Sequence, residues 1–386
     1  MRKSFLVFGS PRIEADEIAE VVDSLKSGWL SSGPKVAKFE QDFKRYAQSP
    51  HAVAVHSCTA GLFLSLVVAN IKHGDEVITT PFTYAATVNV IVHRGAIPVF
   101  VDINPRTMNM DVHQVEKKIT PRTKAIIPVH FAGRPCDMQA LSALAKKYKL
   151  TVIQDAAHAL ETRYHGKPIA AWGDLTSFSF YVTKNLSTGE GGMVTTGNKR
   201  WAEMIQILAS QGMTRGAWRR YSDKGYRQYR IILPGFKFNM MDLQAGLGLR
   251  QLTKIEKYLK IRERIWNQYD EGFKDLPLET PAAPEPKTRH ARHLYTILLD
   301  LTALKINRDQ FQQALYRLNI GTGVHFVAVH MQPYYKKAFR FKDSDYPQSA
   351  AVSNRTLSLP LSAKLSNGDV QDVITAVRTV IRRHKR

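Results

Sequence analysis

The sequence predicts an α/β protein with a mainly parallel sheet and a second, smaller α/β domain at its C-terminal end. Through the first half of the chain, short apolar runs alternate with amphipathic stretches, which is the pattern of strands separated by covering helices. Residues 275–288 are rich in proline and exclude a regular helix. A chain of 386 residues can bury two cores, so we expect a large domain over residues 1–250 and a small one over 251–386.

The strands of the first domain are separated by helical segments. In chain order, the expected elements are a strand at 51–57, a helix at 59–71, strands at 74–81, 97–103 and 124–131, a helix at 138–149 and a strand at 150–157. Strands joined in this way indicate a parallel or mostly parallel sheet with both faces covered.

The second domain is expected to follow a long connecting helix at 243–273. The proline-rich segment comes next, and then a strand at 294–301, a helix at 307–319 capped by Asn307 and a terminal helix at 369–384. These elements predict a smaller α/β unit.

The composition is that of an ordinary globular protein, apart from its charge. Lys and Arg exceed Asp and Glu by 22, which favours anionic partners such as nucleic acid, anionic membranes or phosphorylated metabolites, although a solvated basic surface explains most of these residues equally well. The two cysteines, Cys58 and Cys136, lie far apart without metal-ligand spacing, so we expect no disulfide framework and no metal site. No apolar run approaches the roughly 18 residues of a membrane-spanning helix, and the N-terminal apolar run is too short for a signal peptide. We therefore expect a cytoplasmic protein.

Residues 175–192 read LTSFSFYVTKNLSTGEGG and place Lys184 just past an aromatic strand. A lysine in this position commonly extends to water along its apolar stem, and the stretch alone indicates no more than that. Alternation along the strand directs Ser177, Ser179 and Tyr181 to one face and Phe178 and Phe180 to the other.

Other polar groups follow strands of the predicted sheet. Asp155 comes directly after LTVIQ, where it could cap a helix or pair with a cationic ligand atom such as a protonated pyridine nitrogen. Ser57, Cys58 and Thr59 stand where a strand turns into a helix, and such a helix start can bind an anion or simply be N-capped by these residues. Tyr84 could be a core residue, or it could stack on a planar ring and hold that ring in place.

Together these residues form a set with one chemical use. They supply a carboxylate, a phosphate cradle to which Ser179 adds a hydroxyl, a stacking aromatic ring and a lysine. Pyridoxal 5′-phosphate requires such a set, because the carboxylate keeps its pyridine nitrogen protonated and the lysine binds it covalently and then moves protons.

The motifs also resemble, in the same order, those of the DegT/DnrJ/StrS family of sugar-nucleotide aminotransferases. The resemblance covers nearly the whole chain and is carried by SGWLSSGPKVAKFEQDF, SCTAGL, TTPFTYAAT, VDI, VHFAGRPCDM, QDAAHALE, SFSFYVTKNLSTGEGG, GFKFNMMDLQAGLGLRQL and GVHFVAVHMQPYYKKAF. It implies the fold of fold-type I aminotransferases, in which a large domain has a mixed, mainly parallel seven-stranded sheet and a smaller C-terminal domain follows.

The resemblance also implies roles for single residues. It makes Lys184 the Schiff-base lysine, Asp155 the partner of the pyridine nitrogen, His158 the neighbour of the ring's phenolic oxygen, Tyr84 the stacking ring, and Ser57, Cys58, Thr59, Ala60 and Ser179 the phosphate site. Asn239 matches a residue that reaches the phosphate from the neighbouring subunit, which implies a homodimer with shared active sites. Cys58 departs from the glycine that many members carry.

The nucleotide-sugar site is implied in the same way. Its candidate residues are Ser31, Arg215, Trp218, His325, Phe326, His330 and Tyr334, and the motif around the last four is closest to members that aminate carbon 4 of the sugar. The alternative without function is that the segment around Arg215 is a solvent-exposed loop. The histidines would then be hydrogen-bonded polar residues near the end of a strand.

The function expected from the sequence is therefore transfer of an amino group from an amino acid, with L-glutamate as the expected donor, to a nucleoside-diphosphate-linked keto-sugar. Relatives that act as sugar dehydratases replace the lysine by histidine, so Lys184 favours transamination. A regulatory or nucleic-acid-binding role on this scaffold is the alternative from another class. No nucleic-acid module supports it, and no GxGxxG follows the first strand to support a dinucleotide enzyme.

Overall fold

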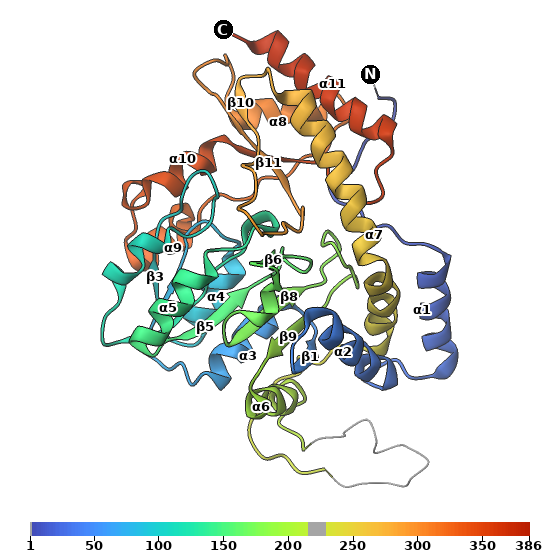
Figure 1. Cartoon of the computed structure of the whole chain (residues 1–386), viewed down its shortest axis with the longest axis vertical. Helices are drawn as coiled ribbons and strands as arrows, with labels where there is room; N and C mark the ends of the chain where they lie inside the picture. The colour runs from blue at the N-terminus through green and yellow to red at the C-terminus, as the bar shows by residue number, and fades with distance from the viewer. Residues whose placement is uncertain (1, 215–228) are drawn as a thin grey trace.

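The computed structural model describes residues 2–214 and 229–386 of the chain. At its centre lies a seven-stranded sheet with the strand order β1-β9-β8-β5-β4-β2-β3 (Figure 1). In chain order the strands are β1 (His51–Val55), β2 (Glu76–Thr79), β3 (Ile97–Phe100), β4 (Thr123–Ile126), β5 (Thr151–Asp155), β8 (Leu175–Ser179) and β9 (Gly192–Thr196). Strand β9 is antiparallel to both of its neighbours and the other pairs are parallel. The predicted mixed, mainly parallel sheet is confirmed.

Helices cover both faces of this sheet because its strands bury side chains on both sides. Adjacent residues of β1 enter different cores: Val53 packs with α3 (Cys58–Val68), α4 (Ala85–His93) and α6 (Lys199–Ala209), and Ala54 packs with α2 (Pro34–Ala47) and α5 (Met138–Tyr148). On the second of these faces, Phe178 and Phe180 contact the rings of α2, as the alternation along β8 predicts.

The long helix α7 (Asp242–Phe273) joins the two halves of the molecule (Figure 1). Leu249 and Leu252 in its first part belong to the core beneath the seven-stranded sheet, whereas Trp266 and Tyr269 further along belong to the second core. Residue 250 therefore lies inside a continuous helix, and the predicted boundary between 250 and 251 stays a prediction.

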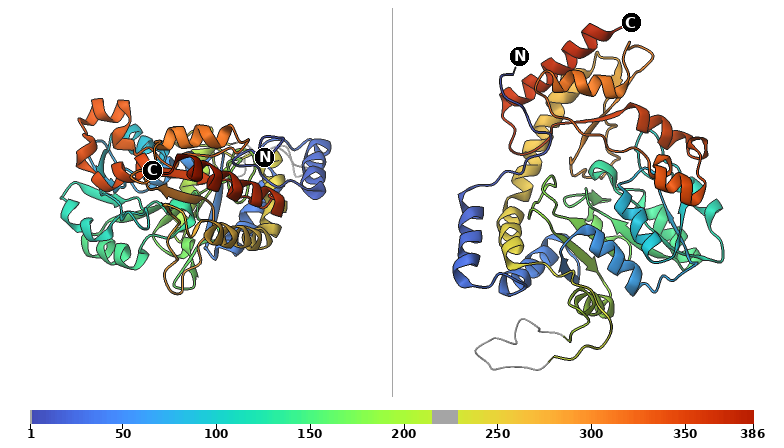
Figure 2. Two further views of the ribbon diagram at one scale, coloured as in Figure 1. Left: turned by 90° about the horizontal axis from the view of Figure 1, so that it is seen from above. Right: turned by 180° about the vertical axis from the view of Figure 1, so that it is seen from behind.

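The second core surrounds a small antiparallel sheet in the order β10-β11-β12. Its elements are β10 (Leu278–Glu279), β11 (Tyr295–Leu299), α8 (Arg308–Tyr316), β12 (Thr356–Leu359) and α11 (Asn367–His384). Two further helices, α9 (Pro333–Phe339) and α10 (Pro347–Arg355), pack in smaller clusters with residues such as Phe82 and Phe100 of the large domain. Both chain ends lie at this end of the molecule (Figure 2). Asn307 caps α8 as predicted, since its Oδ1 accepts from Gln310 N at 2.9 Å.

A short hairpin, β6 (Arg163–Tyr164) and β7 (Lys167–Pro168), completes the described strands. None of the helices in the described part of the chain combines the length and the apolarity needed to cross a membrane.

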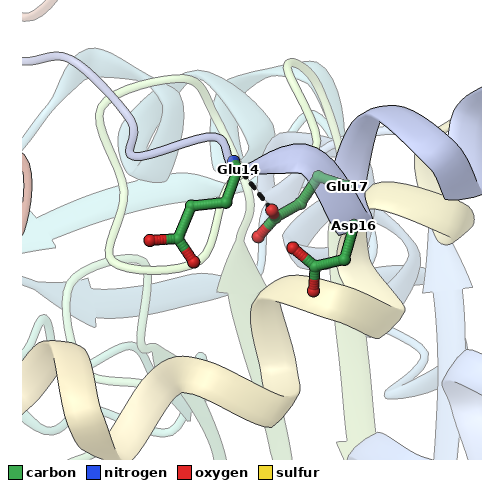
Figure 3. Close-up of side chains that lie close together, drawn as sticks. All are labelled: Glu14, Asp16 and Glu17. Carbon is green, nitrogen blue, oxygen red and sulfur yellow. Dashed lines mark hydrogen bonds between the residues drawn. The ribbon is translucent and has the colours of Figure 1, made fainter.

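Helix α1 (Ala15–Ser27) is held against α7 by a charged cluster (Figure 3). Glu14, Asp16 and Glu17 group their carboxylates within reach of one another, and Glu17 Oε2 accepts from the backbone N–H of Glu14 at 2.8 Å. Lys254 of α7 places its Nζ 3.0 Å from Glu14 and 2.8 Å from Glu17, and the surrounding carboxylates raise the pKa of this lysine. A lysine ammonium therefore already balances part of the charge of this cluster.

Candidate active site

The predicted site residues gather at the carboxyl edge of the central strands. Asp155 is the last residue of β5, and β8 beside it ends at Ser179. Lys184 follows β8 in a turn in which its backbone N–H donates to Tyr181 O at 2.8 Å. Parallel strands present their ends at one edge, so the sheet itself brings the carboxylate and the lysine together.

Lys184 lies in surroundings that weaken its hold on a proton. Its side chain is half-buried, and desolvation lowers the pKa of its ammonium to about 8, while the charges of Asp155 and Cys58 oppose this change. An amine with such a pKa exists partly in its neutral, nucleophilic form at physiological pH.

Asp155 is buried, with only 6% of its surface exposed. Its Oδ2 accepts from Thr87 Oγ1 at 2.7 Å, and its Oδ1 accepts from the backbone N–H of Ala157 at 3.1 Å, with Cys58 Sγ at 4.0 Å. Burial raises the pKa of this carboxyl, and the two hydrogen bonds and Lys184 oppose the change by favouring the anion.

The start of α3 forms a close-packed anion cradle next to this edge. Ser57 caps the helix, its Oγ accepting from Ala60 N at 3.1 Å, while Cys58 is buried and Thr59 is exposed. Gly192 of β9 lies so near that a Cβ on it would fall 2.5 Å from Ser57 C and 2.7 Å from Cys58 N. Only glycine permits this approach, which leaves the first backbone N–H groups of α3 at the edge of the sheet.

Ser179 stands directly opposite Gly192 in the β8–β9 ladder. Ser179 therefore lies at the same edge of the sheet as the start of α3. The contacts place Ser57, Cys58, Ala60 and Ser179 in one neighbourhood, and their role as a phosphate site stays a prediction.

An aromatic group adjoins the lysine and the carboxylate. Tyr84 is 68% exposed at the start of α4, with its ring centroid 6.3 Å from that of Phe326. Phe326 lies nearly parallel to His158 at 6.1 Å and beside His325 at 5.2 Å. Four predicted site residues thus meet here, although they come from distant parts of the sequence.

The histidines of this group are neutral. Burial lowers the pKa of His158 far below its usual range, and burial with the nearby Lys184 lowers that of His325 to about 3. His158 Nδ1 accepts from the backbone N–H of Ala132 at 3.2 Å, so the ring proton of the neutral imidazole is on Nε2.

His293 and Asn185 also belong to the site, and the sequence analysis did not identify them. The ring of His293 lies 4.4 Å from that of His158, and its Nδ1 lies 3.0 Å from Asn185 Oδ1. Asn185 directly follows the lysine and donates through Nδ2 to Glu161 Oε2 at 2.9 Å. Asn185 lies within the motif SFSFYVTKNLSTGEGG, directly after Lys184, whereas for His293 the histidine pair at 290 and 293 before a strand was the signal in the sequence.

Ser31, a predicted substrate residue, and Asn239, predicted to reach the phosphate from a neighbouring subunit, lie in another part of the fold. Asn239 forms a bridge with Val55 and donates to Ser32 Oγ at 2.7 Å, and the carbonyl of Ser31 accepts from Asp242 N at 3.0 Å. These contacts put Ser31 and Asn239 near the end of β1, just before the start of α3.

Two residues of the C-terminal motif lie apart from the histidine group. His330 is fully buried with its ring 5.0 Å from that of Tyr346, whereas Tyr334 is 58% exposed on α9. Arg215 and Trp218 lie outside the described residues.

The chain matches the model of the DegT/DnrJ/EryC1/StrS aminotransferase family over residues 11–378. It belongs to this family. The family predicted from the sequence is confirmed, and the chain is a pyridoxal-phosphate-dependent sugar aminotransferase of fold type I.

Close relatives and solved structures of the family cover the whole chain. The protein is 51% identical over 99% of its length to the uncharacterized protein MJ1066 of Methanocaldococcus jannaschii, covering 99% of that protein. It is 48% identical to the spore coat polysaccharide biosynthesis protein SpsC of Bacillus subtilis, over 99% of this chain and 98% of that one. The putative sugar aminotransferase Spr1654 of Streptococcus pneumoniae, in its PMP form, superposes with a TM-score of 0.91 at 35% identity, over 98% and 99% of the two chains.

The residues present in this aminotransferase fit its cofactor. Asp155 offers a carboxylate held by two donors, Lys184 offers an amine whose pKa is lowered, and the cradle at Gly192 opens backbone N–H groups of α3 toward a phosphate. The charges of Lys184 and Asp155 act on each other, so the two groups lie near each other at this edge.

Proposed function

We propose that this aminotransferase moves the amino group of L-glutamate to carbon 4 of a keto-sugar linked to a nucleoside diphosphate. The observation that carries the proposal is the proximity of Lys184, whose pKa is lowered to about 8, to the buried Asp155. Both lie at the edge of the sheet where α3 begins. When bound, pyridoxal 5′-phosphate accepts the amino group from the donor and draws electrons from the carbon that exchanges its proton.

Lys184 is the proton carrier in this proposal. With a pKa of about 8, roughly a tenth of its amines are neutral at pH 7 and can take a proton from carbon. After accepting that proton, the amine delivers it to the carbon on the other side of the transfer.

Asp155 and His158 orient the ring on which this transfer occurs. Asp155, anionic through the donors Thr87 and Ala157, holds the proton of the ring nitrogen. His158, fixed by the backbone of Ala132, keeps its ring proton on Nε2, from which it would donate to the phenolic oxygen of the bound cofactor. Tyr84 would cover a face of the ring. Ser57, Cys58, Thr59, Ala60 and Ser179 would hold the phosphate, which Asn239 would reach from the neighbouring subunit.

The sugar nucleotide is assigned to the exposed side of the aromatic group. His325, Phe326 and Tyr334 would contact the sugar and its nucleotide, with Ser31, Arg215 and Trp218 as further candidates, and the diphosphate suits the bidentate donors of an arginine. His330, which is fully buried, is not among the proposed contacts. Assignment to carbon 4 follows from the resemblance of the 323–339 motif to family members with that regiochemistry.

A homodimer with shared active sites is part of the proposal. Helix α1 exposes Ile18, Val22 and Leu25, one above another at helical spacing, with 58%, 40% and 56% of their surfaces exposed. A contiguous apolar stripe of this kind supports a protein interface, and a second copy of the chain would bury it.

The experiment that tests the proposal follows visible absorbance. Purified enzyme is loaded with pyridoxal 5′-phosphate, treated with L-glutamate, and then supplied with nucleoside-diphosphate 4-keto-sugars. We expect a band that glutamate bleaches and a keto-sugar restores, and no such lysine-linked band in Lys184→Ala. A protein that gains no band would contradict the whole site, a band indifferent to glutamate would contradict the donor, and loss of water from the sugar without glutamate consumption would favour the dehydratase.

A further inference from the structure

A line of two hydroxyl groups leads to the carboxylate of Asp155. Thr87 Oγ1 lies 2.7 Å from Asp155 Oδ2, and Thr83 Oγ1 lies 2.8 Å from Thr87 Oγ1. All three residues are buried, with exposed fractions of 2% for Thr83, 0% for Thr87 and 6% for Asp155. Water therefore has little access to replace either hydroxyl.

The direction of the hydrogen bonds in this line is fixed by chemistry. An ionised carboxylate only accepts, so Thr87 must donate its single hydroxyl proton to Asp155. The oxygen of Thr87 can then only accept from Thr83, which makes Thr83 the outer donor. A donor that itself accepts a hydrogen bond is polarised and binds an anion more strongly.

The line of hydroxyl groups begins at Thr83, just before α4, and continues to Thr87 in its first turn, next to Tyr84. Thr83 and Tyr84 precede this helix, and Thr87 N donates to Tyr84 O at 3.2 Å. One helical turn thus connects the ring face, through Tyr84, with the ring-nitrogen partner, through Thr87.

The other oxygen of Asp155 has weaker side-chain support. Oδ1 accepts from the backbone N–H of Ala157 at 3.1 Å, and the thiol of Cys58 lies 4.0 Å away. The titratable groups whose charges act on Asp155 are Cys58 of α3 and Lys184 after β8. Thr87 is thus the side chain that makes a short hydrogen bond to the carboxylate.

We propose that Thr87, with Thr83 behind it, is a positioning residue that keeps Asp155 ionised and directed at the ring nitrogen of the cofactor. The inference rests on the pyridoxal-phosphate chemistry of the proposed function but not on its donor or its sugar. Without the Thr87 hydroxyl, Asp155 takes up a proton more readily and leaves the ring nitrogen without a full counter-charge.

The test compares Thr87→Val, which keeps the shape and removes the hydroxyl, with Thr87→Ser, which keeps the hydroxyl. Thr79→Val is the matched control, because Thr79 is an equally buried threonine whose hydroxyl donates to Ile127 O at 2.9 Å, away from Asp155. The first readout is the dissociation constant of pyridoxal 5′-phosphate for the apoenzyme, from quenching of tryptophan fluorescence. We expect about a tenfold increase for Thr87→Val, the loss typical of one hydrogen bond to a charged group, and less than about twofold for the other two.

The second readout is the pH titration of the visible band of the loaded enzyme. A ring nitrogen that holds its proton less firmly withdraws fewer electrons from the rest of the cofactor. The pH midpoint of the band should therefore move to higher pH in Thr87→Val. It should stay in place in Thr87→Ser and Thr79→Val. A merely structural threonine would not move this midpoint. Equal behaviour of Thr87→Val and Thr79→Val, or of Thr87→Val and Thr87→Ser, would overturn the proposal.

Thr83→Val keeps the test valid if Thr87→Val does not fold. It removes the outer donor and leaves the Thr87–Asp155 bond, so we expect a smaller weakening of cofactor binding in the same direction. No weakening in Thr83→Val would overturn the two-hydroxyl line. Failure of the wild-type apoenzyme to bind pyridoxal 5′-phosphate would instead refute the cofactor site itself, so the two failures are distinguishable.

Discussion

Arg262 and Glu161 form an ion pair in the interior, with 3% and 0% of their side-chain surfaces exposed. Arg262 belongs to α7, and Glu161 follows β5 and also accepts from Asn185, the residue next to Lys184. The pair therefore joins the helix that runs between the two cores to the turn that carries Lys184. Because both charges are removed from water, each is stabilised mainly by the opposite charge of its partner.

Breaking this pair on one side should destabilise the enzyme strongly. We expect Glu161→Ala to lower the free energy of unfolding by about 3–5 kcal/mol, since it leaves the Arg262 charge buried and unpaired. Glu256→Ala is the control, because its pair with Arg289 is partly exposed and should contribute only about 0–1 kcal/mol. Urea unfolding of both variants measures the difference, and similar losses in the two would contradict the buried pair's importance.

The lowered pKa of Lys184 predicts a pH dependence of apoenzyme stability. Below pH 8 the lysine is charged in both the folded and the unfolded state, and its burial destabilises the fold. Between about pH 8 and its ordinary value of 10.5, only the unfolded chain remains protonated, so stability attributable to this group rises with pH. Lys184→Met should therefore be more stable than wild type at pH 7, with a gap that narrows over that window.

Urea unfolding of the apoenzyme at a series of pH values checks this expectation. The exposed Lys117→Met serves as the control for loss of a lysine without loss of a buried charge. A gap between wild type and Lys184→Met that stays constant from pH 7 to 10 would show that the lysine is not desolvated.

Gly192 is predicted to tolerate no side chain. In Gly192→Ala the new Cβ would meet Ser57 C at 2.5 Å, so β9 or the start of α3 must move. We expect a loss of stability of about 1–3 kcal/mol from overpacking and a weakening of pyridoxal 5′-phosphate binding by more than tenfold. Gly197→Ala, at the other end of β9, has open space around its Cβ and should bind the cofactor like wild type. Equal cofactor affinity in the two variants would place the phosphate elsewhere.

The sequence predicts the positions of the strands along the chain well, because the periodicity of apolar residues is a local property. The expected helix at 138–149 and the strand at 150–157 correspond to α5 and β5 within a few residues. The antiparallel β9 did not emerge from the pattern, since GMVTT resembles any buried strand and its direction depends on which neighbours it joins. Strand direction is a tertiary property.

The site divides in the same way. Asp155 and Lys184 are visible in the sequence because a charged residue beside an apolar strand is conspicuous. Thr87 and His293 are not, since a threonine in a helix and a histidine before a strand usually serve packing. Their roles appear only when folding brings Thr87 to 2.7 Å from Asp155 and the ring of His293 to 4.4 Å from that of His158.

The apolar stripe of α1 makes the proposed homodimer testable. If Ile18, Val22 and Leu25 face a second copy of the chain, introducing two charges there in Ile18→Glu/Val22→Glu should dissociate the dimer, because unpaired carboxylates would have to be buried. Sedimentation velocity should then show half the wild-type mass with the helical content unchanged. Ile97→Glu is the matched control, since Ile97 is 38% exposed at the opposite edge of the large sheet and should leave the mass as it is. If the active sites are shared as proposed, the α1 variant should also lose cofactor affinity. A variant that stays dimeric would place the interface on another surface.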